Sequence, residues 1–441
     1  MLLRKRQASK TPINITCLYE ALKLGLFMVV PRESACLDGY RNIPVQADHR
    51  DIVRFRSAQD PNYSILLAEL SRWMSLLSLE LERDALNVDK LCRTLDFPKI
   101  WNREFLIARG LEGSCRWIRD STEYQAWKNR RNLDVSHGIL WIKGKPGSGK
   151  STLMKNLSET TDASHLSPHA LRLTFFINKR WAHLEKTLPG LYRSLLRQIL
   201  KQSEAKTVIS SLLMRYQRKV AVTNDLDIKW DLVELEEAFY DVIDSPSFPP
   251  AEIFTDALDE CEEDQVRHFV KRIAKSARKA HLEGRVLNVC WSSRHYPQIT
   301  VPYCFTLRME DGNLNDIKKF VHDGLATDLY QSDVLDLENR IVERARGVFL
   351  WASLVLQKLN RASDEGSCKS ELVAILQSLP KEVDSLLKEI ILSIQSRHRL
   401  DCLRLFQWLM YSPFAPFYLS EVELALSLSQ SDFSHGDSLE A

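Results

Sequence analysis

The sequence has little net charge and no long apolar run. Among its 441 residues, 60 Lys and Arg stand against 58 Asp and Glu, which leaves no overall electrostatic case for binding nucleic acid. The longest apolar stretches, 24–30 and 348–356, fall well short of the roughly 18 residues that a membrane helix needs. No apolar block adjoins the charges at the N-terminus, unlike in a signal peptide. We therefore expect neither a membrane nor nucleic acid among the partners.

Cysteine motifs are also missing. The nine cysteines are scattered, without a CxxC pair and without a His/Cys cluster at zinc-ligand spacing. This usage is typical of reduced, mostly buried thiols in the cytosol or nucleus. We expect a cytoplasmic location.

Residues 1–90 lack the features of a complete domain. We expect a short strand at 26–30 and a helix over 63–86. The strings at 29–35 (VVPRESA), 47–49 (ADH) and 54–55 (RF) resemble the C-terminal end of the α/β-hydrolase-like domains often fused upstream of fungal NTPases. In a hydrolase, the histidine of the second string would be the general base of a Ser-His-Asp triad. No GxSxG nucleophile elbow precedes it, so we expect a remnant without hydrolase activity.

A glycine-rich run follows the apolar residues 139–142 and leads into a helical pattern. It consists of Gly144, Lys145, Pro146, Gly147, Ser148, Gly149, Lys150, Ser151 and Thr152. Such glycines let successive N–H groups and the N-terminus of the next helix converge on a phosphate chain. Lys150 is predicted to reach the terminal phosphates, and the Ser151 hydroxyl to bind Mg²⁺. A glycine-rich turn that matches by chance is the alternative, but the flanking strand and helix favour a nucleotide-binding P-loop.

Acidic residues follow a second predicted strand. Asp256 is placed to bind Mg²⁺ through water, while Asp259 and Glu260 are placed to polarise an attacking water. Arg294 follows a third strand and can contact a γ-phosphate, as in P-loop ATPases with an added strand between the P-loop strand and the Walker B strand. The alternatives are a solvated acidic turn and a surface ion pair of Arg294.

Strand and helix patterns alternate through the middle of the chain. Predicted strands at 139–142, 170–177, 252–257, 285–291 and 303–307 are separated by helical patterns, among them 188–200, 235–243 and 265–280. This order predicts an α/β fold, with a parallel sheet covered by helices on both faces. Further helices are predicted within 91–134, as a linker that packs on this core; a sensing helix that reports the nucleotide state is the alternative. After residue 312, helices are predicted at 314–325, 334–359, 371–379, 381–394 and 400–411.

Together the motifs resemble those of fungal NACHT proteins, which are STAND-class P-loop NTPases whose NTPase module is also described as nephrocystin-like. The resemblance spans about 95–426 and rests above all on the P-loop, the DALDEC string at 256–261, SSR at 292–294 and GVFLWASLV at 347–355. It implies a signalling switch in which ADP holds a closed form and ATP exchange opens it for assembly. It also implies a domain order of remnant 1–90, linker 91–134, NTPase core 135–312, helical lid 313–378 and partial winged-helix region 379–441.

Other absences narrow the function. The sequence has no Asn-Lys-x-Asp motif for guanine, so ATP and ADP are expected rather than GTP, with Mg²⁺. Arg215, Arg218 and Lys219 do not form the arginine-rich lid of a small-molecule kinase, and no ankyrin, WD or tetratricopeptide repeat follows the winged-helix region. We expect slow hydrolysis, with self-association or partner proteins on activation. Three alternatives stay open: a non-catalytic interaction protein stabilised by nucleotide, an inactive truncated NLR-like product, and a lipase-like hydrolase that uses His49.

Overall fold

The computed structural model describes residues 15–97, 102–159, 170–178, 183–203, 206–222, 228–296, 299–326, 331–411 and 419–423. The chain divides into two compact units, Met1–Asp89 and Lys90–Ala441. Within the described ranges, no helix is long and apolar enough to cross a membrane.

The first unit is built on a two-stranded parallel sheet. Strand β1 (Thr16–Glu20) pairs with β2 (Arg41–Val45), and the short helix α2 (Arg32–Ala35) lies in the connection between them. Helix α3 (Pro61–Leu95) includes the predicted helix 63–86 and ends in the second unit. The predicted helix is therefore confirmed, and it starts earlier and ends later than predicted.

The predicted strand at 26–30 is wrong. Gly25 takes a left-handed φ of +70°, and the chain turns there so that the N–H of Leu24 donates to the carbonyl of Phe27 at 3.0 Å. Leu26 and Phe27 are 82% and 76% exposed. An apolar run forms a strand where a neighbouring strand pairs with it and covers it. Here β1 and β2 pair with each other instead.

The second unit contains a five-stranded parallel sheet in the order β4–β5–β6–β3–β7. Its strands are β3 (Ile139–Lys143), β4 (Leu171–Phe176), β5 (Ala251–Asp256), β6 (Leu287–Ser293) and β7 (Phe305–Arg308). All five predicted strands are present, and β6 is the added strand between the P-loop strand β3 and the acidic strand β5. The predicted α/β fold of a P-loop NTPase is confirmed.

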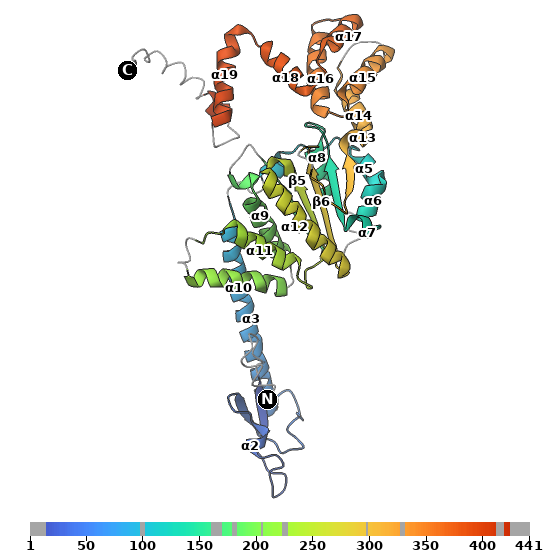
Figure 1. Cartoon of the computed structure of the whole chain (residues 1–441). Coiled ribbons are helices and arrows are strands. Elements are labelled where there is room, and N and C mark those ends of the chain that lie inside the picture. The colour runs from blue at the N-terminus through green and yellow to red at the C-terminus, as the bar shows by residue number, and fades with distance from the viewer. Residues whose placement is uncertain are drawn as a thin grey trace, which may run out of the picture. The chain divides into compact units, whose positions relative to one another are not determined.

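Helices cover both faces of this sheet (Figure 1). On one face, α8 (Lys150–Glu159), α5 (Arg116–Asp120) and α6 (Thr122–Lys128) share a buried cluster with β3, β5 and β6. On the other face lie α9 (Leu188–Gln202), α11 (Leu232–Ile243) and α12 (Glu263–Leu282). Tyr192 of α9 packs on Phe239 of α11, with ring centroids 5.4 Å apart, and Phe269 of α12 packs on Trp291 of β6, with ring centroids 6.5 Å apart.

The linker before the sheet is helical, as predicted. It contains α4 (Asn102–Leu106), α5, α6 and α7 (Leu133–Ser136). The indole N–H of Trp127 donates to the carbonyl of Gly138 at 2.9 Å, which ties α6 to the start of β3. Helix α10 (Lys206–Val222) has no counterpart among the predicted helices.

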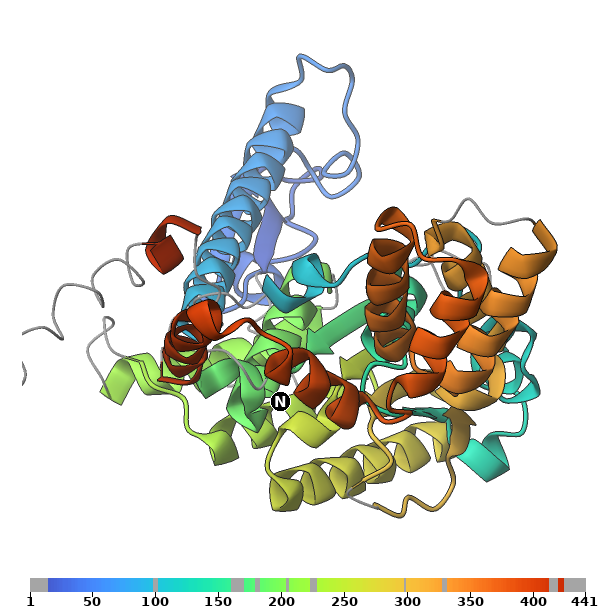
Figure 2. The same ribbon diagram turned by 90° about the horizontal axis from the view of Figure 1, so that it is seen from above.

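An all-α region follows β7. After α13 (Met309–Gly312), the helices α14 (Leu314–Gly324), α15 (Gln331–Ala345), α16 (Phe349–Asp364) and α17 (Lys369–Ser378) share one hydrophobic core around Trp351. Figure 2 shows them in orange as a bundle. The predicted stretch 334–359 is divided at Arg346 and Gly347, which both take left-handed backbone angles.

Two more helices, α18 (Val383–Leu392) and α19 (Ser396–Tyr411), follow the bundle and match the predicted 381–394 and 400–411. Of the region expected to form a partial winged helix, residues 412–418 and 424–441 lie outside the described part of the chain.

The parallel register brings three functional segments together. Lys143, at the end of β3, is paired with Ser293 at the end of β6, and Thr255 near the end of β5 is paired with Trp291. In open parallel sheets, ligands bind at the carboxyl ends of the strands. The P-loop, the acidic residues and Arg294 therefore start from one edge of the sheet.

Candidate nucleotide-binding site

The loop between β3 and α8 has the geometry of an anion-binding loop. Gly147 and Gly149 take φ values of +73° and +91°, which residues with a side chain rarely adopt. Helix α8 begins at Lys150, so its unpaired N–H groups and the positive end of its dipole face the loop. The nine predicted loop residues thus form one cradle at the start of this helix.

The side chain of Lys150 folds back over that cradle. Its Nζ donates to the carbonyls of Gly144 and Lys145, each at 2.9 Å. Burial lowers the pKa of Lys150, and the carboxylates of Asp259 and Asp256 oppose this shift. Phosphate oxygens bind an ammonium group more strongly than neutral carbonyls do, so Lys150 can exchange these partners for a phosphate.

Asp256 ends β5 and is only 1% exposed. Its Oδ2 accepts a hydrogen bond from Ser151 Oγ at 2.6 Å, and its Oδ1 accepts one from Ser292 Oγ at 2.5 Å. Burial raises the pKa of Asp256, and Arg103 is the foremost group that opposes the rise. The two residues predicted to bind the metal, Ser151 and Asp256, are thus in direct contact.

The other predicted catalytic residues are held in ion pairs. The backbone turns at Ala257, with φ +59°, into the short 3₁₀ helix Leu258–Glu260. Asp259 Oδ1 accepts the backbone N–H of Arg294 at 2.8 Å, and Asp259 Oδ2 lies 3.1 Å from the Nε of the same arginine. Glu260 Oε2 lies 2.8 Å from Nη1 of Arg103, a residue that is not among the predicted ones.

A cavity of about 640 Å³ lies over the P-loop, a volume typical of small-molecule sites. Its polar lining includes Lys150, Ser151, Asp259, Glu260 and Arg294. Its apolar lining comes from the linker and the all-α region and includes Leu111, Cys115, Phe320, Phe349 and Leu350. The cavity therefore offers charged groups to phosphates and apolar side chains to a base.

Residues of the all-α region donate hydrogen bonds to carbonyl groups of the P-loop. The Nδ2 of Asn313 donates to the carbonyl of Ser148 at 3.2 Å and to that of Gly347 at 2.9 Å. The N–H of Leu350 donates to the carbonyl of Gly147 at 3.2 Å. None of these lid contacts is predicted from the sequence. The nearest sequence signal is the GVFLWASLV string, which contains Gly347 and Leu350.

The oxygen atoms at Ser151 and Asp256 suit Mg²⁺ better than a transition metal. Mg²⁺ prefers hydroxyl and carboxylate ligands and usually takes one or two of them from the protein, with water and phosphate oxygens completing its shell. Among the described residues, no group of three or more His, Cys, Asp and Glu could hold a metal by itself. The site therefore fits a Mg²⁺ that binds together with a nucleotide.

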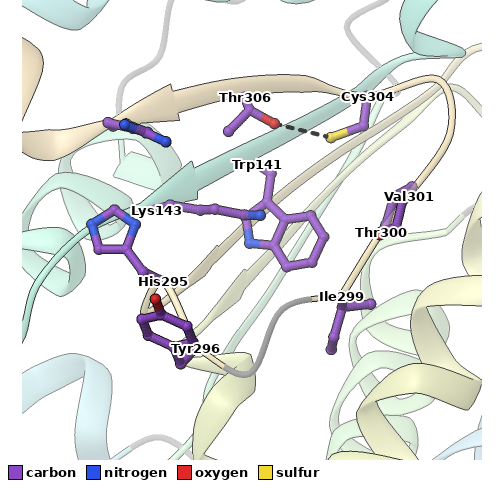
Figure 3. Close-up of a pocket in the computed structure, with 10 residues that line it drawn as sticks. Trp141, Lys143, His295, Tyr296, Ile299, Thr300, Val301, Cys304 and Thr306 are labelled. Atoms are coloured by element: carbon purple, nitrogen blue, oxygen red, sulfur yellow. Dashed lines mark hydrogen bonds between the residues drawn. The ribbon is translucent and has the colours of Figure 1, made fainter.

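A second cavity, of about 560 Å³, lies against β3 and β7 (Figure 3). Lys143 Nζ lies 4.2 Å from the ring centroid of Trp141, and burial lowers the pKa of this lysine. Burial also raises the pKa of Cys304 to about 11, which favours the protonated thiol at neutral pH. None of the residues predicted for the nucleotide site lines this second cavity.

In the first unit, His49 faces a buried carboxylate. Its Nδ1 lies 3.5 Å from Oε2 of Glu20, whose other oxygen accepts the N–H of Val30 at 2.7 Å. Glu20 ends β1 and is not among the predicted residues. The pair provides a base and an acid, but a hydrolase triad also needs a nucleophile.

Comparison with known proteins gives a family match over the middle of the chain. The model of the family described as "Nephrocystin 3, N-terminal" matches residues 113–294. No curated protein matches the chain significantly.

Similar solved structures have low identity. The structure of Drosophila ORC bound to DNA is 14% identical, with a TM-score of 0.35, and the match covers 79% of each chain. Cdc6p from Pyrobaculum aerophilum is 13% identical, with a TM-score of 0.34 and coverage of 72% of this chain and 82% of that one. The Walker-type ATPase paby2304 of Pyrococcus abyssi is 15% identical, with a TM-score of 0.31 and coverage of 74% and 93%.

Scores this low carry no argument about function. The family match is more informative, because residues 113–294 include every residue predicted for the nucleotide site. The chain carries a nucleotide-binding P-loop NTPase domain similar to the nephrocystin 3 N-terminal family.

Proposed function

We propose that this protein is an ATP/ADP-binding signalling switch of the NACHT type, with slow Mg²⁺-dependent hydrolysis. One observation carries the proposal: the P-loop, the acidic residues after β5 and the lid helices α14 and α16 all line one cavity. A phosphate chain bound there contacts the core next to the lid. Hydrolysis or exchange of the nucleotide therefore changes how the lid docks on the core. The changed docking then alters the conformation and assembly of the protein.

In this proposal the core residues have separate roles. Lys150 and the N–H groups of the P-loop bind the phosphates. Ser151 and Asp256 hold Mg²⁺, which neutralises charge that develops during phosphoryl transfer. Glu260 orients a water and accepts its proton. Asp259 shares that task and, through its two contacts with Arg294, fixes the arginine that binds the γ-phosphate.

The apolar lining of the cavity favours adenine as the base. Leu111 comes from the linker, while Phe320 and Phe349 come from α14 and α16. Adenine can be recognised largely by shape and apolar contact, which these side chains provide. A base held between linker and lid would also keep the two together, and this supports ADP as the ligand of a closed form.

The wider assignments rest on the sequence resemblance. We include in the proposal a fungal NACHT architecture with an α/β-hydrolase remnant over 1–90, a lid over 313–378 and a partial winged-helix region over 379–441. Self-association or binding of partner proteins in the cytoplasm would then follow activation.

A second candidate is a non-catalytic interaction protein that nucleotide only stabilises. The ion pair between Glu260 and Arg103 favours it, because a carboxylate held by a guanidinium is not free to take a proton from water. The two candidates differ in whether phosphate is released at full occupancy with Mg²⁺·ATP.

Glu260→Gln tests the proposal. Phosphate release from Mg²⁺·ATP should fall about 100-fold, the usual contribution of a general base, while ATP binding persists. Glu263→Gln, at the exposed start of α12, is the control and should hydrolyse ATP like the unchanged protein. Equal rates in all three proteins would remove the role of Glu260. No phosphate release from the unchanged protein at full occupancy would support the non-catalytic candidate.

A further inference from the structure

One arginine joins both acidic positions of the nucleotide site. Nη1 of Arg103 lies 2.8 Å from Glu260 Oε2, and Nη2 lies 3.7 Å from Asp256 Oδ2. The Arg103 side chain is 19% exposed and lines the cavity over the P-loop. A single guanidinium therefore neutralises the proposed metal ligand and the proposed base together.

The short helix that carries this arginine, α4, is fastened to the core. Nζ of Lys155 donates to the carbonyls of Glu104 and Ile107, each at 2.8 Å. Lys155 belongs to α8, the helix that begins at the P-loop. On β4, Thr174 Oγ1 donates to Glu104 Oε2 at 3.3 Å. The position of Arg103 is thus set by the same elements that form the phosphate site.

The positively charged guanidinium of Arg103 lies next to the place where the metal ion would bind. Ser151 Oγ donates to Asp256 Oδ2, the oxygen that is closest to Arg103. A divalent cation bound between Ser151 and Asp256 would therefore lie within a few ångströms of the guanidinium. Two cations so close, in a site of low dielectric, repel each other strongly unless one moves.

We propose that Arg103 is a latch that replaces Mg²⁺ as the counter-ion of Asp256 and Glu260, and that binding of Mg²⁺ with nucleotide displaces it. The latch keeps the base paired until the site is loaded, and its release shifts α4. This deepens the proposed function and rests on it: Arg103 acts as a positioning residue through which the linker senses the loaded state.

The test is thermal unfolding of the full chain in a series of MgCl₂ concentrations, with a non-hydrolysable ATP analogue held at a fixed saturating concentration. Arg103→Gln removes the charge and keeps much of the side-chain length. The half-maximal MgCl₂ concentration for stabilisation should fall at least tenfold in this variant. Arg172→Gln is the matched control. Arg172 pairs with Glu252, a buried carboxylate on the same strand as Asp256, and neither Arg172 nor Glu252 lines the cavity. It should respond to MgCl₂ like the unchanged protein. An unaltered MgCl₂ dependence in Arg103→Gln overturns the latch.

A second measurement uses the unchanged protein and covers the case that Arg103→Gln does not fold. Hydrogen exchange is followed in residues 102–110, where the N–H of Ile107 donates to the carbonyl of Arg103 at 3.1 Å. A non-hydrolysable ATP analogue with Mg²⁺ should speed exchange there severalfold relative to the analogue with EDTA. Equal exchange in the two conditions contradicts the latch.

Binding of a fluorescent ATP analogue to the unchanged protein separates the two hypotheses. The absence of binding refutes the proposed function. Binding of the analogue with an unaltered MgCl₂ dependence in Arg103→Gln refutes the latch alone.

Discussion

Asn313→Ala is expected to loosen the lid and to speed the release of ADP. Asn313 is fully buried, and its Nδ2 donates to one carbonyl of the P-loop and one at the start of the lid helix α16. Each such bond contributes about 1 kcal/mol net, and the two carbonyls would lose their shared donor. The Oδ1 of Asn313 has no hydrogen-bond partner, so its removal offsets part of this loss. We expect a net weakening of about 1–2 kcal/mol, or roughly a 5- to 30-fold change in a rate that depends on lid opening.

Stopped-flow release of a fluorescent ADP analogue measures this rate. Asn360→Ala is the matched control, because Asn360 donates to the carbonyl of Gly324 at 2.8 Å and accepts the N–H of Ala326 at 3.0 Å, both inside the lid. It should destabilise the lid without changing its contact with the P-loop, so its release rate should stay within a few-fold of the parent rate. If Asn313→Ala folds and releases ADP at the parent rate, the contact does not couple lid and nucleotide.

Two further predictions follow from single positions. Gly147→Ala should weaken nucleotide binding at least tenfold, because a Cβ would lie 2.5 Å from Cβ of Leu350; calorimetry should show unaltered binding in Gly284→Ala, which has a similar φ but open space. In the first unit, hydrogen bonds from Arg72 lower the pKa of Glu69 to about 2 from its usual 4.5. The folded state therefore gains stability from ionised Glu69 above pH 4.5 and loses it as the pH falls towards 2. Pepsin cleavage within 15–76 should accelerate over that interval in the parent protein and much less in Glu69→Gln.

The core of the fold could be predicted because its signals are local. The P-loop pattern is contained in nine consecutive residues, and the strands that lead into it and into the acidic turn are short apolar runs. The contact between Ser151 and Asp256 could also be predicted, because parallel strands joined by crossover helices end at one edge of the sheet. The strand expected at 26–30 failed because an apolar run does not reveal whether a partner strand exists.

The contacts of the linker and the all-α region with the site could not be predicted in this way. Asn313 lies 165 residues from Ser148, and Arg103 lies 157 residues from Glu260. An asparagine between two helices, or an arginine on a short helix, has a sequence pattern like that of many surface residues. Only the packing of the linker and the all-α region on the core selects its partner. The roles of Asp259, Glu260 and Arg294 and the domain limits stay predictions that depend on binding and kinetic measurements.

Isothermal titration of Mg²⁺·ATP and Mg²⁺·ADP into the unchanged protein and into Lys150→Ala tests the central claim most directly. The unchanged protein should bind one nucleotide per chain at the P-loop. Loss of the charged hydrogen bonds from Nζ to phosphate should weaken binding by about 2–3 kcal/mol, or roughly 30- to 150-fold. Equal affinity in the two proteins, or no binding to the unchanged protein, would contradict the assignment of this cavity as the nucleotide site.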